Sequence, residues 1–100
     1  MLNTKKIIFL FFILNLFFFA YSSEEVRIKL ATTTSTENSG LLKYLLPYFE
    51  NTTNIKVDVI AVGTGKALKL GENGDVDVVL VHARNLEDKF VTDGFGVDRK

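Results

Sequence analysis

The chain has 100 residues, of which 12 are basic and 12 are acidic, so its formal net charge at pH 7 is 0. This length is enough for one small domain at most, and the scattered, balanced charges do not favour binding to nucleic acid. Because the sequence contains no cysteine and a single histidine, His82, it excludes a disulfide framework and a thiolate metal site. We expect no bound cation and no cofactor.

The first 22 residues follow the order of regions that is typical of a secretory signal peptide. Lys5 and Lys6 give a positive start, and the run from Ile7 to Phe19 is almost wholly apolar. Small residues of the kind that a signal peptidase reads come next. The alternative is a membrane anchor, but a spanning helix needs about 20 apolar residues and this run is shorter.

We therefore expect cleavage after Ser22 and an exported, periplasmic product that spans residues 23–100. The removed segment carries two of the 12 basic residues and no acidic residue, which leaves 10 basic and 12 acidic residues and a formal charge of −2.

A run of five hydroxyl residues, Thr32 to Thr36, lies between a predicted strand and a predicted helix. Alternating apolar and charged residues predict the strand, from Val26 to Thr32, and a stripe of Leu and Phe side chains predicts the helix, from about Gly40 to Glu50. A helix start leaves backbone N–H groups unpaired and carries partial positive charge, so it can bind an anion. The alternative is a simple N-cap, for which a single hydroxyl residue is enough.

Three details of this region carry expectations of their own. Pro47 lies inside the helix pattern and should kink or restart the helix, because it removes one backbone hydrogen bond. The segment from Asn51 to Asn54 is predicted to be a turn. Glu37 is expected in the turn before the helix, with its side chain pointing outward.

Two further strands and a short helix complete the pattern. We expect a strand over Ile55 to Val62, a helix over Thr64 to about Leu70 that Gly71–Gly74 ends, and a strand over Val76 to Val81. The last strand is apolar except for Asp77, which is typical of a central parallel strand covered on both faces. The order βαβαβ predicts an α/β fold with an open parallel sheet.

Ligands of open α/β sheets bind at the carboxyl ends of the strands, and three segments of this sequence reach that edge. They are Thr32–Thr36, Val62–Gly65 and His82–Arg84. Because glycine has no Cβ, the backbone N–H groups of Gly63 and Gly65 can approach a ligand closely.

The segment after the second strand is not a nucleotide-binding motif. A Walker loop would need glycine where Ile60 stands and Ser or Thr where Ala67 stands, and a dinucleotide fingerprint would need glycine where Leu68 stands. A hydroxyl nucleophile would need a base beside it, and only His82 has the right chemistry. We expect this histidine to line the cleft or cap the backbone, so we do not expect an enzyme.

Three blocks of the sequence resemble the tungstate-binding proteins of bacterial ABC transporters. They are Ala31–Leu42, Ile60–Leu68 and Asp75–Arg84, and they come in the order found in that family. The resemblance implies a type II periplasmic binding fold, in which two α/β lobes close on a tetrahedral oxyanion, and makes this chain the N-terminal part of the first lobe. It implies that the anion is lined by Thr32, Thr33, Thr34, Ser35, Val62, Gly63, Thr64 and Gly65.

The same resemblance implies two partners, a tungstate or molybdate oxyanion and the membrane permease of an ABC transporter. Both anions lack a proton near neutral pH, so a pocket made only of donors suits them, whereas phosphate keeps a proton and needs an acceptor. Neither hydroxyl block contains Asp or Glu, and backbone N–H dipoles could balance the charge.

Members of this family are much longer than 100 residues and contribute an arginine from their later part, for which Arg84 does not substitute. Two alternatives therefore stay open, a truncated inactive fragment and an enzyme on a related two-lobed fold.

Overall fold

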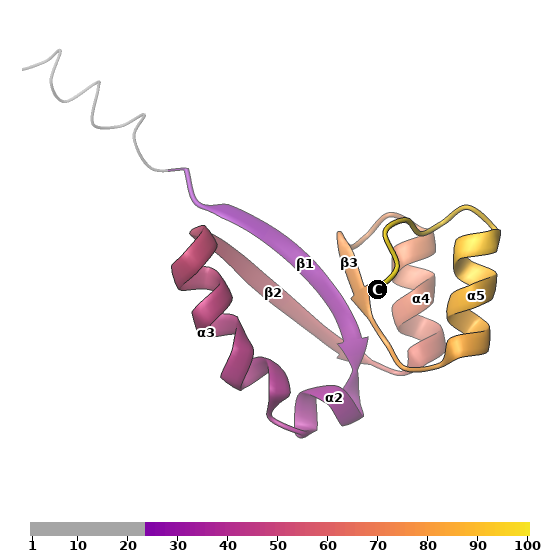
Figure 1. Cartoon of the computed structure of the whole chain (residues 1–100), viewed down its shortest axis with the longest axis horizontal. Coiled ribbons are helices and arrows are strands. Elements are labelled where there is room, and N and C mark those ends of the chain that lie inside the picture. Colours follow the sequence, from indigo (N-terminus) through magenta and orange to yellow (C-terminus); the bar gives the residue numbers. More distant parts are fainter. Residues whose placement is uncertain (1–23) are drawn as a thin grey trace, which may run out of the picture.

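The computed structural model describes residues 24–100. These residues form an α/β unit whose three parallel strands are β1 (Val26–Thr33), β2 (Ile55–Val62) and β3 (Val78–Leu80). Its helices are α2 (Thr34–Asn38), α3 (Leu41–Thr53), α4 (Thr64–Glu72) and α5 (Arg84–Thr92). The predicted α/β class and open parallel sheet are confirmed (Figure 1). The predicted signal peptide lies outside the described residues.

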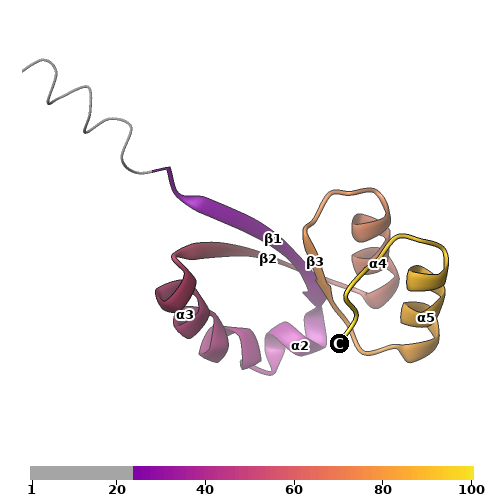
Figure 2. The ribbon, with the colours of Figure 1, turned by 45° about the horizontal axis from the view of Figure 1, so that its top comes forward.

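The strand order is β2-β1-β3, so β1 is the middle strand of the sheet. Figures 1 and 2 show α2 and α3 on one side of the sheet and α4 and α5 on the other. The buried hydrophobic residues of the described chain come from β1 and from the helices beside it, namely Leu30, Ala31, Leu42 and Ala67. The core is therefore built around β1, which carries the hydroxyl run at its end.

The prediction that the last strand is central and covered on both faces is wrong for the described residues. β3 lies at the sheet edge, and its Val78 and Leu80 side chains are 41% and 38% exposed. β3 also begins later than predicted, because Asp77 bonds to Lys29 with its side-chain carboxylate as well as its backbone N–H, and not with its backbone alone. The Asp77 N–H donates to the Lys29 carbonyl (2.9 Å), and the Lys29 N–H donates to the Asp77 carboxylate (2.8 Å).

Helix α3 is longer than predicted, and the turn predicted at Asn51–Asn54 is reduced to its last residue. The Thr53 hydroxyl donates to the Phe49 carbonyl (2.7 Å) and accepts from the Ile55 N–H (3.2 Å), which joins the last helical turn to β2. Asn54 then reverses the chain with φ 59°, a conformation that asparagine tolerates. The helix does not restart at Pro47, which lies inside it.

The helix break comes earlier than predicted, before α3 begins. The hydroxyl run itself forms the five-residue helix α2, and Gly40, with φ 81°, separates α2 from α3. Only glycine adopts such a φ without steric cost. Glu37 is exposed, as expected, although it lies in α2 and not in a turn.

The second half of the described chain contains more helix than predicted. Helix α4 continues to Glu72, two residues past the predicted end, and Gly74 with φ 74° follows it. Helix α5 was not predicted at all, although Leu86 and Phe90 lie four residues apart and Gly94 follows its end, which are ordinary helix signals. It packs against α4.

Candidate functional site

The strand register brings the three predicted segments to one edge of the sheet. Thr33 at the end of β1 pairs with Val62 at the end of β2, and Thr32 pairs with Leu80 at the end of β3. The chain leaves β1 into α2, β2 into α4, and β3 towards His82. All three connections therefore begin at the same place, the carboxyl edge at which open α/β sheets bind ligands.

Thr32 is fully buried, and its hydroxyl is occupied within the fold. Its side chain donates to the Leu80 carbonyl at 2.7 Å, which fastens β1 to β3 where both strands end. A buried hydroxyl that is already donating has no hydrogen left for a ligand. Thr32 therefore has a structural role at this edge, and a ligand would contact the residues next to it in the hydroxyl run.

Thr33 is the centre of a cluster of hydroxyl groups. It is 4% exposed and is the N-cap of α2, where its side-chain oxygen accepts from the Thr36 N–H at 3.2 Å. The same oxygen lies 2.8 Å from the Thr36 hydroxyl and 3.0 Å from the Ser35 hydroxyl. The cap hypothesis is therefore correct for Thr33, but the cap uses one hydroxyl and leaves the others available.

The next two residues of the run face solvent. Thr34 and Ser35 are exposed at the start of α2. Ser35 is the exposed residue of the hydroxyl cluster, and its oxygen is also 3.3 Å from Nε2 of His82, which itself is 3.4 Å from the Thr33 oxygen. A ligand at this edge would meet Ser35 before it met Thr33.

The start of α4 offers unpaired backbone donors. Gly63 is its N-cap, has no side chain to cap the helix, and accepts the first helical hydrogen bond from the Ala67 N–H. No hydrogen bond from the N–H groups of Thr64, Gly65 or Lys66 is present between residues 24 and 100. This nine-residue helix therefore presents donors and the positive end of its dipole at the same edge.

The two glycines at this helix start are not required by packing. A Cβ at Gly63 or Gly65 would meet no atom within 4 Å, and Gly63 has an ordinary φ of −71°. Gly71 is a useful contrast, because a Cβ there would lie 2.8 Å from Val79 and 2.9 Å from Phe90. Close packing leaves no room for a side chain at Gly71, whereas Gly63 and Gly65 leave open space above the backbone donors.

The charged groups whose pKa values are shifted lie away from this edge of the sheet. The Arg27 guanidinium donates to Asp58 at 2.7 Å and 3.1 Å across β1 and β2. These hydrogen bonds hold the pKa of Asp58 below its ordinary value and raise that of Arg27. Within residues 24–100 no group of three or more His, Asp or Glu side chains could hold a metal ion.

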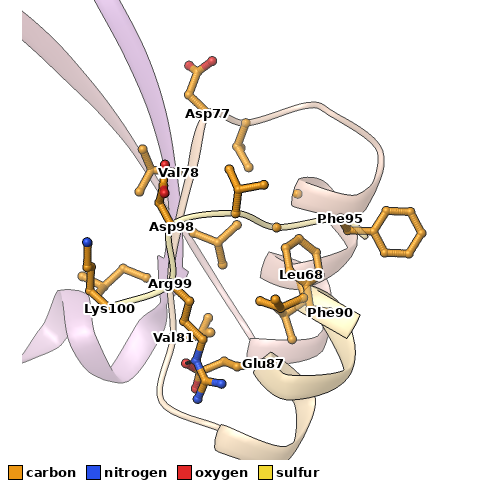
Figure 3. Close-up of a pocket in the computed structure, with 17 residues that line it drawn as sticks. Leu68, Asp77, Val78, Val81, Glu87, Phe90, Phe95, Asp98, Arg99 and Lys100 are labelled. Carbon is orange, nitrogen blue, oxygen red and sulfur yellow. Dashed lines mark ion pairs between the residues drawn. The ribbon is translucent and has the colours of Figure 1, made fainter. Parts of the chain in front are cut away.

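A separate hollow of about 590 Å³ lies between β3, α4, α5 and the C-terminal segment (Figure 3). Apolar side chains such as Leu68 and Phe90 line it, and Arg99 pairs with Glu87 and Asp88 at its rim. None of the eight predicted site residues lines this hollow. It is therefore distinct from the hydroxyl cluster.

The hydroxyl cluster involves two residues that the sequence placed at this edge but not among the eight residues predicted to line the anion. Thr36 belongs to the hydroxyl cluster through its contact with Thr33, and His82 reaches the cluster from beyond β3. The sequence placed Thr36 at this edge as the end of the hydroxyl run. The contact between His82 and Ser35 depends on the strand order, which no local pattern encodes.

No helix between residues 24 and 100 combines the length and the apolar character that crossing a membrane requires.

The fold and sequence are similar to those of proteins that bind tungstate. A crystal structure titled as the tungstate ABC transporter from Geobacter sulfurreducens is 74% identical, with a TM-score of 0.75, over 78% of this chain and 34% of that one. The tungstate-binding protein TupA from Desulfovibrio alaskensis G20 is 56% identical, with a TM-score of 0.70, over 71% of this chain and 28% of that one.

A curated relative, the tungstate-binding protein TupA of Peptoclostridium acidaminophilum, is 56% identical over 73 residues, which are 73% of this chain. The match covers 26% of that relative, so this chain spans about a quarter of its length. These relatives are named as binding proteins or transporters and not as enzymes, which agrees with the expectation from the sequence.

The family model described as a PBP superfamily domain matches residues 20–100 of this chain. That match covers the whole described unit, including the three strand ends and the hydroxyl cluster. The resemblance to tungstate-binding proteins that the sequence suggested is confirmed by relatives found through sequence and through structure. The chain therefore belongs to the PBP superfamily.

Proposed function

We propose that this chain is the N-terminal part of the substrate-binding component of an ABC importer, which captures tungstate or molybdate in the periplasm. One observation carries the proposal. Exposed hydroxyl groups at the start of α2 and unpaired N–H groups at the start of α4 lie at one sheet edge. The names of the relatives supply the class of ligand.

The chemistry of this edge suits a dianion that has no proton. Ser35 and Thr34 offer hydroxyl hydrogens, and the N–H groups of Thr64 and Gly65 offer backbone donors. Every oxygen of tungstate accepts hydrogen bonds, so such a set needs no acceptor. In this proposal Val62 and Thr64 position the backbone around the glycines, Thr33 holds the hydroxyl cluster together, and Thr32 fixes the strand ends beneath it.

One contact favours a second function, an enzyme with a serine nucleophile. The Ser35 hydroxyl lies 3.3 Å from Nε2 of His82, as a nucleophile and its base would. Such a pair also needs a third group that orients the imidazole. No hydrogen bond to the other ring nitrogen of His82 is present between residues 24 and 100. We therefore favour binding over catalysis.

The test requires the remaining part of the protein fold, because this chain spans only about a third of the Geobacter sulfurreducens protein. We propose a chimera in which residues 24–100 replace the segment of that protein to which they correspond. Titration calorimetry at neutral pH should show that one tungstate ion binds per molecule. Phosphate, which keeps a proton, should bind far more weakly, since neither hydroxyl block offers it a carboxylate acceptor.

The control is the unmodified Geobacter sulfurreducens protein, measured in parallel. A folded chimera that binds no tungstate while the control does, or that prefers phosphate, would contradict the proposal. Hydrolysis of a chromogenic ester that disappears in Ser35→Ala would instead support the serine enzyme.

A further inference from the structure

His82 is the only histidine of the chain, and its ring contacts the hydroxyl cluster from the segment that follows β3. Nε2 lies 3.3 Å from the Ser35 oxygen and 3.4 Å from the Thr33 oxygen. Within residues 24–100 no ion pair involves this ring. The hydrogen-bond contacts of this ring in the described residues are therefore those with the two hydroxyl groups.

The hydrogens of the cluster can be counted. Thr33, Ser35 and Thr36 bring three hydroxyl hydrogens, and two contacts join the three oxygens, at 2.8 Å and 3.0 Å. Each contact uses one hydrogen, because a hydroxyl has a single hydrogen and two lone pairs. A third contact joins the cluster to Nε2 of His82, which is shared between Thr33 and Ser35.

The state of Nε2 decides what is left for a ligand. If Nε2 carries no hydrogen, a hydroxyl must donate to it, and the three contacts consume all three hydroxyl hydrogens. If Nε2 carries a hydrogen, the ring donates to Ser35, and one hydroxyl hydrogen stays available. This free hydrogen lies on Ser35, which is exposed, or on Thr36, which is half-buried. Thr33 is only 4% exposed and cannot present a hydrogen to a ligand.

We propose that His82 is a positioning residue for oxyanion binding, which it promotes by donating from Nε2 into the hydroxyl cluster. This inference rests on the proposed function of the same site. The donated hydrogen occupies a lone pair of Ser35, because Thr33 already uses its one hydrogen and two lone pairs in its contacts with the Thr36 N–H and the two hydroxyl groups. A hydroxyl hydrogen therefore turns outward to the anion. A ring with a bare Nε2 would instead turn that hydroxyl away and present lone pairs to the anion, which disfavours binding.

The first test compares variants in the chimera by tungstate calorimetry. His82→Leu removes the donor: the same count leaves one hydroxyl hydrogen free, but nothing holds it outward, so tungstate binding should weaken about five- to tenfold. His82→Gln keeps an amide donor near the position of Nε2 and should stay within about threefold of the parent. Asn51→Ala, at the exposed end of α3, is a control for which no change is expected.

A double-mutant cycle separates positioning from general structural support. If His82 acts through the hydroxyls, His82→Leu should cost little more once Ser35→Ala has removed the outer one, because coupled residues do not add. Thermal melts of every variant check that the fold is retained.

A second measurement observes the ring directly. Selective nitrogen-15 labelling of histidine, with the His82 signals identified by their loss in His82→Gln, shows whether Nε2 carries a hydrogen. We expect Nε2 of the tungstate complex to be protonated. A bare Nε2 in that complex, unchanged affinity in His82→Leu, or additive losses in the double variant would overturn the inference, while tungstate binding by the chimera would leave the proposed function intact. A chimera that binds no tungstate would refute both.

Discussion

Ser35 and Gly65 are the residues on which the proposed anion site depends most directly. Ser35 is the exposed member of the hydroxyl cluster, and Gly65 lies under open space at the start of α4. Their chemistry differs, because Ser35 contributes a side-chain donor and Gly65 contributes access to a backbone donor. They therefore call for different substitutions.

Ser35→Ala should weaken tungstate binding by the chimera about tenfold or more. The variant loses one hydrogen bond to a charged partner, which contributes about 1.5–3 kcal/mol, and 1.4 kcal/mol corresponds to one decade of affinity. Calorimetry measures the loss, and unchanged affinity would exclude Ser35 as a ligand.

Gly65→Val should weaken binding more than Ser35→Ala does. Its Cβ meets no protein atom within 4 Å, so the branched side chain should be accommodated by the fold while it covers the backbone donors. Lys66→Ala is the matched control at the next position, where an exposed lysine should matter little. A collapse of affinity in Lys66→Ala alone would indicate a site built on lysine charge instead of neutral donors.

At the scale of elements, a side-chain hydrogen bond takes the place of a backbone one between β1 and the residue before β3. The Asp77 carboxylate accepts from the Lys29 N–H, so Asp77→Ala should lower the free energy of unfolding of the chimera by about 1–3 kcal/mol. Asp77→Asn keeps an acceptor oxygen and should lose less. Urea unfolding measures both, and equal losses would show that this acceptor does not hold the strand.

The cross-strand pair of Arg27 and Asp58 should give β1 and β2 a pH-dependent contribution to stability. Its hydrogen bonds lower the pKa of Asp58 in the folded state. The pair therefore contributes fully above the ordinary range of an aspartate, near pH 4, and loses its contribution as pH falls through the lowered value. Thermal melts from pH 6 to pH 2 should fall less steeply in Asp58→Asn, and identical slopes would contradict this account.

The sequence predicted the elements that have a clear hydrophobic periodicity, but it did not predict where all of them end. It predicted β1, β2 and the start of α4, because alternation, hydroxyl residues and glycines mark them locally. It missed the position of β3 and the length of α3, since Asp77 and Thr53 act through hydrogen bonds to other elements. It placed Ser35 at the carboxyl edge of the sheet, but it did not predict the contact between Ser35 and His82, which depends on strand order.

At the scale of the whole molecule, the described unit leaves much apolar surface uncovered. Four hydrophobic residues are buried, whereas twelve large hydrophobic side chains are exposed, among them Tyr44 at 66% and Tyr48 at 62%. Small units bury proportionally little surface and are marginally stable. Residues 24–100 alone should therefore melt without a sharp transition or aggregate, and the chimera should melt cooperatively. A sharp monomeric melt of residues 24–100 would contradict this prediction.

Export is also a property of the whole chain. We expect the product secreted by a bacterium with a periplasm to begin near Ser23, because the first 22 residues have the order of a signal peptide. N-terminal sequencing of the periplasmic fraction checks the prediction. A product that keeps Met1 and sediments with membranes would support the anchor instead.

The central claim is that one tungstate ion lies between the Ser35 hydroxyl and the start of α4. A crystal structure of the chimera grown with tungstate, with data collected at a tungsten absorption edge, locates the metal directly. We predict one anomalous peak at the carboxyl edge of the sheet, with oxygens about 2.7–3.2 Å from the Ser35 hydroxyl and the Gly65 N–H. A peak beside the Lys66 side chain, or in the hollow near Phe90 and Arg99, would contradict the claim.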